Sequence, residues 1–247
     1  MSHAATDVVM KTSQHLIIIL LGYIFLVGCS ERESKPRNSL VTLHSAKKVI
    51  TAALARPETT TIHIDQKPVS DGDLELIREN PNITNLLLDE SRVTDSGISV
   101  IATLPNLMHL RVRSKLTDAC IDDLLQIKSL QFLNLPFADF TDQGLIRLAT
   151  HPRIQLLRLR SPRVTDASLP AVAAMKNLAF LHFIEIPVTD TGLESFFDND
   201  QLQSLYLDDS RTTDEGLSAL LVHQPLLHLH INQAHLDNDP NKGHHEQ

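Results

Sequence analysis

Apolar and polar residues follow a unit of about 24 residues along most of the chain. Each unit opens with a strand-like segment whose first, fourth and sixth positions are apolar, as at Ile154, Leu157 and Leu159. After a turn, helix-like spacing follows, as at Leu193 and Phe196. The pattern therefore predicts a short strand and then a short helix in every unit. Ile62 and Ile64 mark the first strand, and Leu226, Leu229 and Ile231 mark the last.

A six-residue box built around Thr-Asp stands between strand and helix in each unit. Its clearest copy is Val-Thr-Asp-Ser-Gly-Ile, which begins at Val93. Ser, Thr and Asp are favoured at helix N-termini, where they accept hydrogen bonds from free N–H groups. We therefore predict helix caps, rather than a ladder of metal-binding carboxylates, because no second ligand lies at short spacing. The aspartates recur every 23 or 24 residues, at Asp71, Asp95, Asp118, Asp142, Asp166, Asp190 and Asp214.

Two residues after the aspartate, four units share a glycine, at Gly97, Gly144, Gly192 and Gly216. We expect the chain to approach the neighbouring unit closely at this position, because glycine has no Cβ. Cys120 and Ser168 replace the glycine in two units. The reading we favour for Cys120 is a small buried thiol rather than a nucleophile.

These boxes and strands resemble the leucine-rich repeat family, and within it the ribonuclease-inhibitor-like and F-box-associated type. The resemblance covers residues 59–236. It implies an α/β fold, a right-handed solenoid with a parallel concave sheet and convex helices. Residues 43–58 are predicted to form an N-terminal capping helix, and residues 237–247 a disordered tail.

The N-terminal segment has a different character. Residues 16–28 carry no charge and end at Cys29. A helix of this length spans about 20 Å, whereas a bilayer core needs about 30 Å. Leu-Val-Gly-Cys resembles the lipobox of bacterial lipoproteins, which implies a signal peptide over residues 1–28, a lipidated Cys29, a flexible tether over residues 29–42 and a cell-envelope location. An uncleaved membrane anchor is the alternative, and translation can begin at Met1 or Met10.

Composition narrows the function. The net charge of −8 argues against general nucleic-acid binding, and two cysteines exclude a disulfide framework. The sequence contains none of the common motifs for nucleophilic, metal-dependent or phosphate-binding catalysis. His228 and His230 share one strand face, but no third metal ligand is placed beside them. We therefore predict a non-enzymatic, monomeric protein without a cofactor.

The outward strand positions vary from unit to unit, as a recognition surface requires. Four arginines form a predicted basic band, and aromatic residues lie between and beyond them. The family resemblance implies partner binding at this concave face, with a protein or an anionic glycan as partner and no nucleic acid. The alternative function is an intracellular adaptor that recruits a substrate to an enzyme. The predicted contact residues are Arg111, Arg113, Phe132, Asn134, Arg158, Arg160, Phe180, His182, Tyr206 and Asp208.

Overall fold

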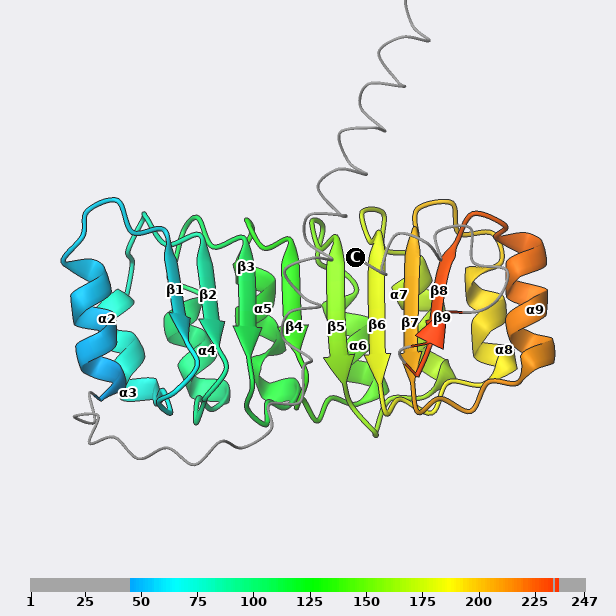
Figure 1. Cartoon of the computed structure of the whole chain (residues 1–247), viewed down its shortest axis with the longest axis horizontal. Helices are drawn as coiled ribbons and strands as arrows, with labels where there is room; N and C mark the ends of the chain where they lie inside the picture. The colour runs from blue at the N-terminus through cyan, green and yellow to red at the C-terminus, as the bar shows by residue number, and fades with distance from the viewer. Residues whose placement is uncertain (1–44, 233, 236–247) are drawn as a thin grey trace, which may run out of the picture. The chain divides into compact units, whose positions relative to one another are not determined.

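The computed structural model describes residues 45–232 and 234–235. In this part of the chain, nine strands form one sheet in sequence order (Figure 1). Strands β1 to β8 are parallel, and only β9 pairs antiparallel, with β8. The strands are β1 Thr61–Ile64, β2 Asn85–Leu88, β3 His109–Val112, β4 Phe132–Leu135, β5 Leu156–Arg160, β6 Phe180–Ile184, β7 Ser204–Asp208, β8 His228–Ile231 and β9 Ala234–His235.

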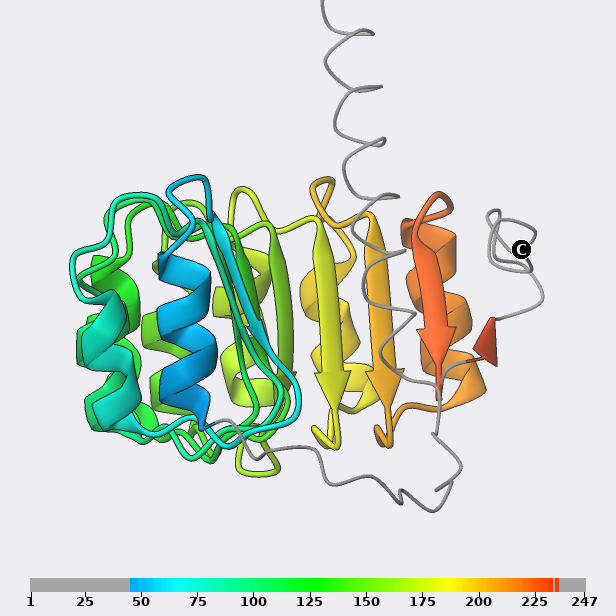
Figure 2. The same ribbon diagram turned by 60° about the vertical axis from the view of Figure 1, so that its left-hand side comes forward.

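Short helices follow the strands and cover one face of the sheet (Figure 2). Helix α2, Ala46–Leu54, precedes β1 and lies inside the segment predicted to cap the repeats. The predicted α/β solenoid, with a parallel sheet in one layer and helices in the other, is confirmed. The later helices are α3 Asp71–Leu74, α4 Asp95–Ile101, α5 Ile121–Gln126, α6 Asp142–Leu148, α7 Leu169–Ala173, α8 Asp190–Leu193 and α9 Asp214–His223, with 3₁₀ turns at Glu75–Ile77, Asp118–Cys120, Asp166–Ser168 and Glu194–Phe196.

Aliphatic side chains fill the space between the two layers. Leu133, Leu157 and Leu181 are register partners on β4, β5 and β6, and all three are fully buried. Phe183 and Phe196 occupy inward positions of the same core, as the pattern predicts. Full burial stabilises such a side chain by about 1.5–3 kcal/mol. Stability is therefore distributed over many similar layers, because each repeat buries its apolar face against its neighbours.

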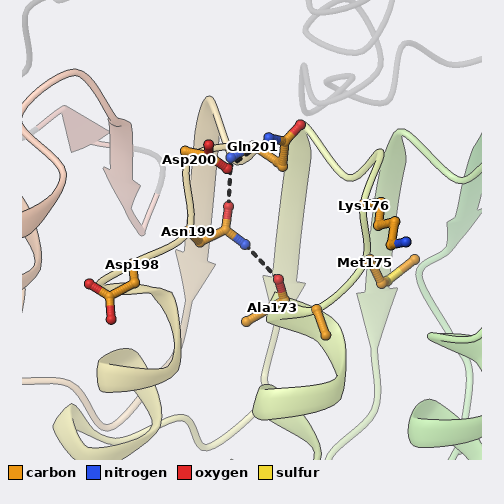
Figure 3. A pocket seen from close by; sticks show the side chains of 8 residues that line it. Ala173, Met175, Lys176, Asp198, Asn199, Asp200 and Gln201 are labelled. Carbon is orange, nitrogen blue, oxygen red and sulfur yellow. Dashed lines mark hydrogen bonds between the residues drawn. The ribbon is translucent and has the colours of Figure 1, made fainter.

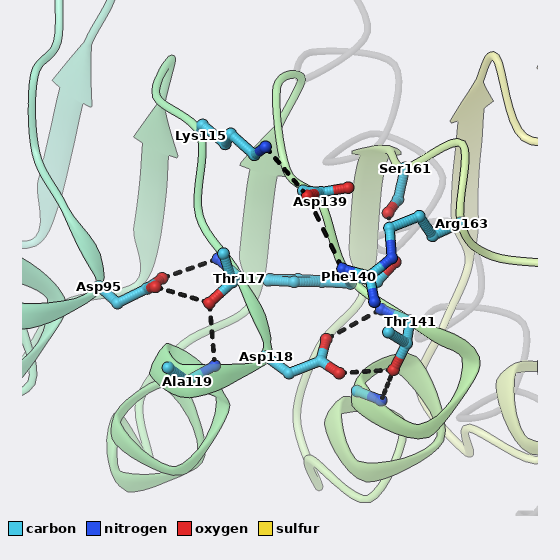
Figure 4. Close-up of polar contacts among 11 residues, drawn as sticks. Asp95, Lys115, Thr117, Asp118, Ala119, Asp139, Phe140, Thr141, Ser161 and Arg163 are labelled. Carbon is cyan, nitrogen blue, oxygen red and sulfur yellow. Dashed lines mark hydrogen bonds and ion pairs between the residues drawn. The ribbon is translucent and has the colours of Figure 1, made fainter.

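The aspartates of the first six boxes each bind the next repeat, as Figure 4 shows for Asp95 and Asp118. Asp95 Oδ1 accepts the backbone N–H of Thr117 at 2.7 Å, and its Oδ2 accepts the Thr117 hydroxyl at 2.6 Å. Each carboxylate thus accepts two hydrogen bonds from the residue that precedes the next helix. These bonds join two neighbouring repeats. The same pair of bonds forms in Asp71–Thr94, Asp118–Thr141, Asp142–Thr165, Asp166–Thr189 and Asp190–Thr213.

The structure differs here from the prediction that the aspartates cap their own helices. The N-cap position falls to the residue before each aspartate, and at Thr141 the side chain accepts the Gly144 N–H at 3.2 Å. The side chains of Thr117, Thr165 and Thr213 also accept such a bond, whereas those of Thr94 and Thr189 do not. Each aspartate is instead the first residue of its helix or 3₁₀ turn, where its charge still suits the positive end of the helix. The correction applies to Asp71, Asp95, Asp118, Asp142, Asp166 and Asp190; Asp214 likewise follows its cap, Thr213.

The aspartate of one repeat also explains why the next repeat has a glycine two residues after its own aspartate: a side chain there would collide with that carboxylate. A Cβ added to Gly144 would lie 2.1 Å from Asp118 Oδ1, and one added to Gly216 would lie 2.0 Å from Asp190 Oδ1. This confirms the predicted close approach to the neighbouring repeat. Where Cys120 and Ser168 supply a side chain at this position, the helix begins with a 3₁₀ turn instead.

The last repeat departs from the predicted pattern by one residue. Leu226 is 82% exposed, and Leu227 takes the inward position at 2% exposure. Helix α9 is the longest of the described helices and continues to His223. Gln224 then donates from Nε2 to the Phe197 carbonyl at 2.8 Å, which fixes the turn before β8. The longer helix therefore changes which leucine enters the core.

The predicted signal peptide, Cys29, the tether and the tail of residues 237–247 lie outside the described residues. Among the residues that the structure does describe, no helix has the length and apolar character needed to cross a bilayer.

A pair of glycine substitutions tests the bond between repeats. We expect Gly144→Ala to destabilise the protein by about 2–3 kcal/mol, because the new methyl group displaces the Asp118 carboxylate from Thr141. Gly72→Ala is the matched control, because its Cβ would meet only Ser70 Oγ at 4.0 Å. It should be neutral or stabilise by about 0.5–1 kcal/mol. Urea unfolding measures both, and equal effects would contradict the close-approach argument.

Candidate binding surface

The outward side chains of the sheet form ordered rows across the strands. Arg111 pairs in register with Asn134, and Asn134 pairs with Arg158. The row continues through His182 and Tyr206 to His230. Side chains at register positions of parallel strands lie on the same face, so we call these six residues the middle row. The structure therefore brings five predicted contact residues into one line, Arg111, Asn134, Arg158, His182 and Tyr206.

Two further rows flank the middle row. One contains Phe132 on β4 and Phe180 on β6, with Leu156 between them in register. The other contains Arg160 on β5 and Asp208 on β7, with Ile184 between them. Arg113 follows directly after β3. All ten predicted contact residues thus lie on or beside one face of the sheet.

Three arginines of the predicted basic band form ion pairs with carboxylates. Arg111 donates from its guanidinium to Asp89 Oδ2 at 2.6 Å, and Arg113 Nε lies 3.4 Å from Asp89 Oδ1. His63 Nε2 lies 2.8 Å from the same Asp89 Oδ2. Arg160 pairs with Glu185. Asp89 and Glu185 were absent from the predicted site, although their places at the ends of β2 and β6 put them within reach of these arginines.

A similar balance holds at the turns beside the sheet. Lys115 Nζ lies 3.1 Å from Asp139 Oδ2, and Arg163 approaches the same oxygen at 3.7 Å (Figure 4). The basic residues of two repeats therefore share one carboxylate from the repeat between them. The surface as a whole presents paired charges of both signs rather than a continuous positive field.

Arg158, His182 and Asp208 form a chain of hydrogen bonds across β5, β6 and β7. Arg158 Nε donates to His182 Nδ1 at 3.2 Å. His182 Nε2 lies 2.8 Å from Asp208 Oδ2. Burial is the main cause that lowers the pKa of His182, and the positive charge of Arg158 lowers it further, while the contact with Asp208 opposes both.

Five rings lie together on β6, β7 and β8, and we call them the ring cluster: Phe180, His182, Tyr206, His228 and His230. Tyr206 is at its centre, stacked on His230 with centroids 4.1 Å apart and on Phe180 at 4.9 Å. The Nε2 atoms of His228 and His230 lie 2.6 Å apart. The two histidines extend the predicted site, and their i, i+2 spacing on the last strand is the sequence pattern that indicates it.

His109 on β3 lies beside the middle row and packs edge-on against Phe132, with ring centroids 5.9 Å apart. Burial, together with the nearby charge of Arg111, lowers the pKa of His109 from 6.5 to about 4. The imidazole is therefore neutral at pH 7. Asn134, one strand along, is fully buried, and its side-chain Oδ1 and Nδ2 have no hydrogen-bond partner.

Other parts of the described chain offer no comparable site. A shallow pocket of about 400 Å³ lies between the ends of α7 and the 3₁₀ turn Glu194–Phe196 (Figure 3). Its central residue, Asn199, donates to the Ala173 carbonyl at 2.8 Å and accepts from the Gln201 N–H at 2.9 Å, which is a structural role. Within residues 45–232 and 234–235, no three potential ligands converge on a metal position.

Cys120 is buried, and its thiol donates to the Thr117 carbonyl at 3.2 Å. Burial is the main cause that raises the pKa of this thiol, and the nearby Asp95 carboxylate raises it further. A thiol held in its neutral form is a poor nucleophile, so the predicted structural role of Cys120 is confirmed.

Comparison with known proteins identifies the fold. No family model and no curated protein matches the sequence. Internalin C2 from Listeria monocytogenes is similar in structure with a TM-score of 0.54 and 16% identity, over 80% of this chain and 88% of that one. A second internalin of that organism, inlF, gives a TM-score of 0.45 and 18% identity, over 68% of this chain and 54% of that one. The likeness to internalin C2, together with the parallel sheet, shows that the protein has the α/β leucine-rich-repeat solenoid fold.

Acidification tests the environment of His109. The unfolded histidine takes up its proton near pH 6.5 and the folded one near pH 4, so the unfolded state binds more protons between these values. Stability should therefore fall as pH decreases from 6.5 to 4, by at most about 3 kcal/mol from this group. Urea unfolding over this pH range should show that the free energy of unfolding falls less in His109→Gln than in the wild-type protein. The exposed helix residue His223 is the control, and an equal reduction in His223→Gln would contradict the assignment.

Proposed function

We propose that this protein is a non-enzymatic leucine-rich-repeat lipoprotein of the cell envelope that binds a protein partner through the outward face of its sheet. The middle row is the observation that carries the proposal. It places six side chains of four different types in consecutive register on the sheet, from Arg111 to His230. Repeats of a solenoid need identical residues only at inward positions, so variety at outward positions supports recognition.

The pairing of charges favours a protein over an anionic glycan. Arg111 and Arg113 already share Asp89, and Arg160 already has Glu185. A polyanion would compete with these carboxylates and would be repelled by them. A protein surface with charges of both signs matches such a face, because paired charges then supply specificity and orientation.

Aromatic and amide groups supply the second part of the argument. Tyr206 is the centre of the ring cluster, and tyrosine is enriched among residues that dominate binding energy. Asn134 keeps a buried donor and a buried acceptor unpaired, at a cost of about 1–3 kcal/mol. A purely structural role does not explain this cost at the centre of the middle row.

Partner capture tests the surface. We expect Tyr206→Ala to weaken binding by about 30-fold, which corresponds to about 2 kcal/mol for a central aromatic residue. Arg113→Glu, which places a second carboxylate beside Asp89, should weaken it as well. Arg147→Glu is the matched control, because Arg147 lies on α6 and pairs with Asp122 on the helical layer. Affinity measurement with the captured partner, alongside circular dichroism, decides the question. Unchanged binding in both sheet-face variants would contradict the proposal.

The proposed cell-envelope location rests on the N-terminal sequence, and fatty-acid attachment at Cys29 tests it. Metabolic labelling with a fatty acid should mark the wild-type protein and not Cys29→Ser, because Cys29 is the acceptor in the lipobox resemblance. Cys120→Ser is the control variant and should keep the label, since Cys120 lies in the repeat core. An unlabelled protein in the cytosol would instead support the intracellular adaptor.

A further inference from the structure

Asn134 carries a buried amide without a hydrogen bond on the outward face of the sheet. The residue lies on β4 and is fully buried. Within the part of the chain that the structure describes, neither its Oδ1 nor its Nδ2 has a hydrogen-bond partner. Buried side-chain polar atoms in folded proteins are in large majority hydrogen-bonded, so this amide is an exception. A donor and an acceptor that are left open in the free protein are available to a bound group.

The fold does not require an amide at this position. Leu87 holds the equivalent register position on β2, two strands earlier. Asn85, another outward asparagine on β2, is satisfied by its surroundings, because its Nδ2 donates to Thr61 Oγ1 at 3.1 Å and to Thr84 Oγ1 at 2.9 Å. The sheet therefore accepts a leucine in this row, and it satisfies an asparagine elsewhere on the same face.

Arg111 adds a second open donor on the neighbouring strand. It is the register partner of Asn134 on β3 and is 8% exposed. Its Nη2 donates to Asp89 Oδ2 at 2.6 Å, whereas its Nε has no hydrogen-bond partner among the described residues. Adjacent strands thus offer two donors, Arg111 Nε and Asn134 Nδ2, and one acceptor, Asn134 Oδ1.

A carboxamide is the group that complements Asn134. It holds an N–H donor and a carbonyl acceptor side by side in one plane, as the asparagine side chain itself does. Its N–H can donate to Asn134 Oδ1 while its oxygen accepts from Asn134 Nδ2. A carboxylate would instead place a second acceptor against Oδ1, and an ammonium group would meet the positive charge of Arg111.

The depth of Asn134 favours a side chain over a main chain as the source of this carboxamide. Neighbouring strands lie about 4.8 Å apart, so the space between outward side chains admits the planar end of a side chain but not a peptide main chain with its own substituents. The amide is closed over in the free protein, since Asn134 is fully buried. Entry therefore needs a rotamer change of an outward neighbour, and such changes are common when proteins bind each other.

We propose that Asn134 is a specificity-determining residue of the outward face, and that it binds the side-chain carboxamide of a glutamine or asparagine in the protein partner. This inference rests on the proposed function, because it names the chemical group that the same surface recognises. The two hydrogen bonds form only in the complex. Asn134 therefore adds to affinity and not to the stability of the free protein.

The first experiment needs no partner and compares two outward asparagines by urea unfolding. Asn134→Leu and the smaller Asn134→Val remove the open donor and acceptor, so at least one of them should unfold at a urea concentration equal to or above that of the wild-type protein. Asn85→Leu is the matched control and should unfold at a lower concentration, because two hydrogen bonds are lost. A lower midpoint in both Asn134 variants would show that the amide stabilises the free protein and would overturn the inference.

The second experiment selects binders from a phage-displayed library of random short peptides, with the full chain as the target. Peptides selected by the wild-type protein should share a glutamine or asparagine at one position. Changing that residue to the matching acid keeps its shape but replaces the donor, and should weaken binding about tenfold or more. Asn134→Leu should bind the original peptides more weakly by a similar factor, whereas Asn85→Leu should bind them as the wild-type protein does.

The outcomes separate this inference from the proposed function. Peptides that bind wild-type protein and Asn134→Leu equally, or that share no carboxamide, would overturn the role of Asn134. If those peptides bind Tyr206→Ala more weakly, the outward face still binds and the proposed function stands. Recovery of no peptide would also overturn the inference, and the proposed function would fail with it if no partner is captured either.

Discussion

The bond between an aspartate and the threonine one repeat later is the interaction on which the rest of the structure depends. It satisfies a backbone donor and a hydroxyl at the start of every following helix in the series, from Asp71–Thr94 to Asp190–Thr213. Apolar burial drives the layers together but has no direction. The carboxylate supplies that direction, because only one offset between neighbouring repeats allows both hydrogen bonds.

The architecture could be predicted from the sequence because its causes are local and repeated. The spacing of leucines indicates which residues enter the core, and the boxes indicate where each helix begins. The role of the aspartates could not be predicted, because Asp118 binds a residue 23 positions away, and local rules favour a cap on its own helix. The inward position of Leu227 was missed for a related reason, since it follows from the length of α9.

The position of the candidate binding surface could be predicted from the sequence, but the distribution of charge on it could not. Period-two alternation places Arg111 and Arg158 outward, and the register then aligns them. The counter-charges of this face come from strand ends one repeat away, as where Asp89 pairs with Arg111 and Glu185 pairs with Arg160. Counting basic residues along outward positions therefore overstates the positive field, because the count ignores partners that only the stacked repeats bring close.

One repeat is a residue shorter than the others, since Asp95 and Asp118 are 23 positions apart. The shortening falls in the turn after β3, yet Asp95 still holds Thr117 through both oxygens. A typical unit carries a carboxylate that accepts two hydrogen bonds from its successor and a threonine that donates two to its predecessor. A gene that gains or loses a whole unit therefore restores a continuous series at the junction. The width of the outward sheet face can thus change in evolution by one strand at a time, while the Asp–Thr hydrogen bonds between repeats stay the same.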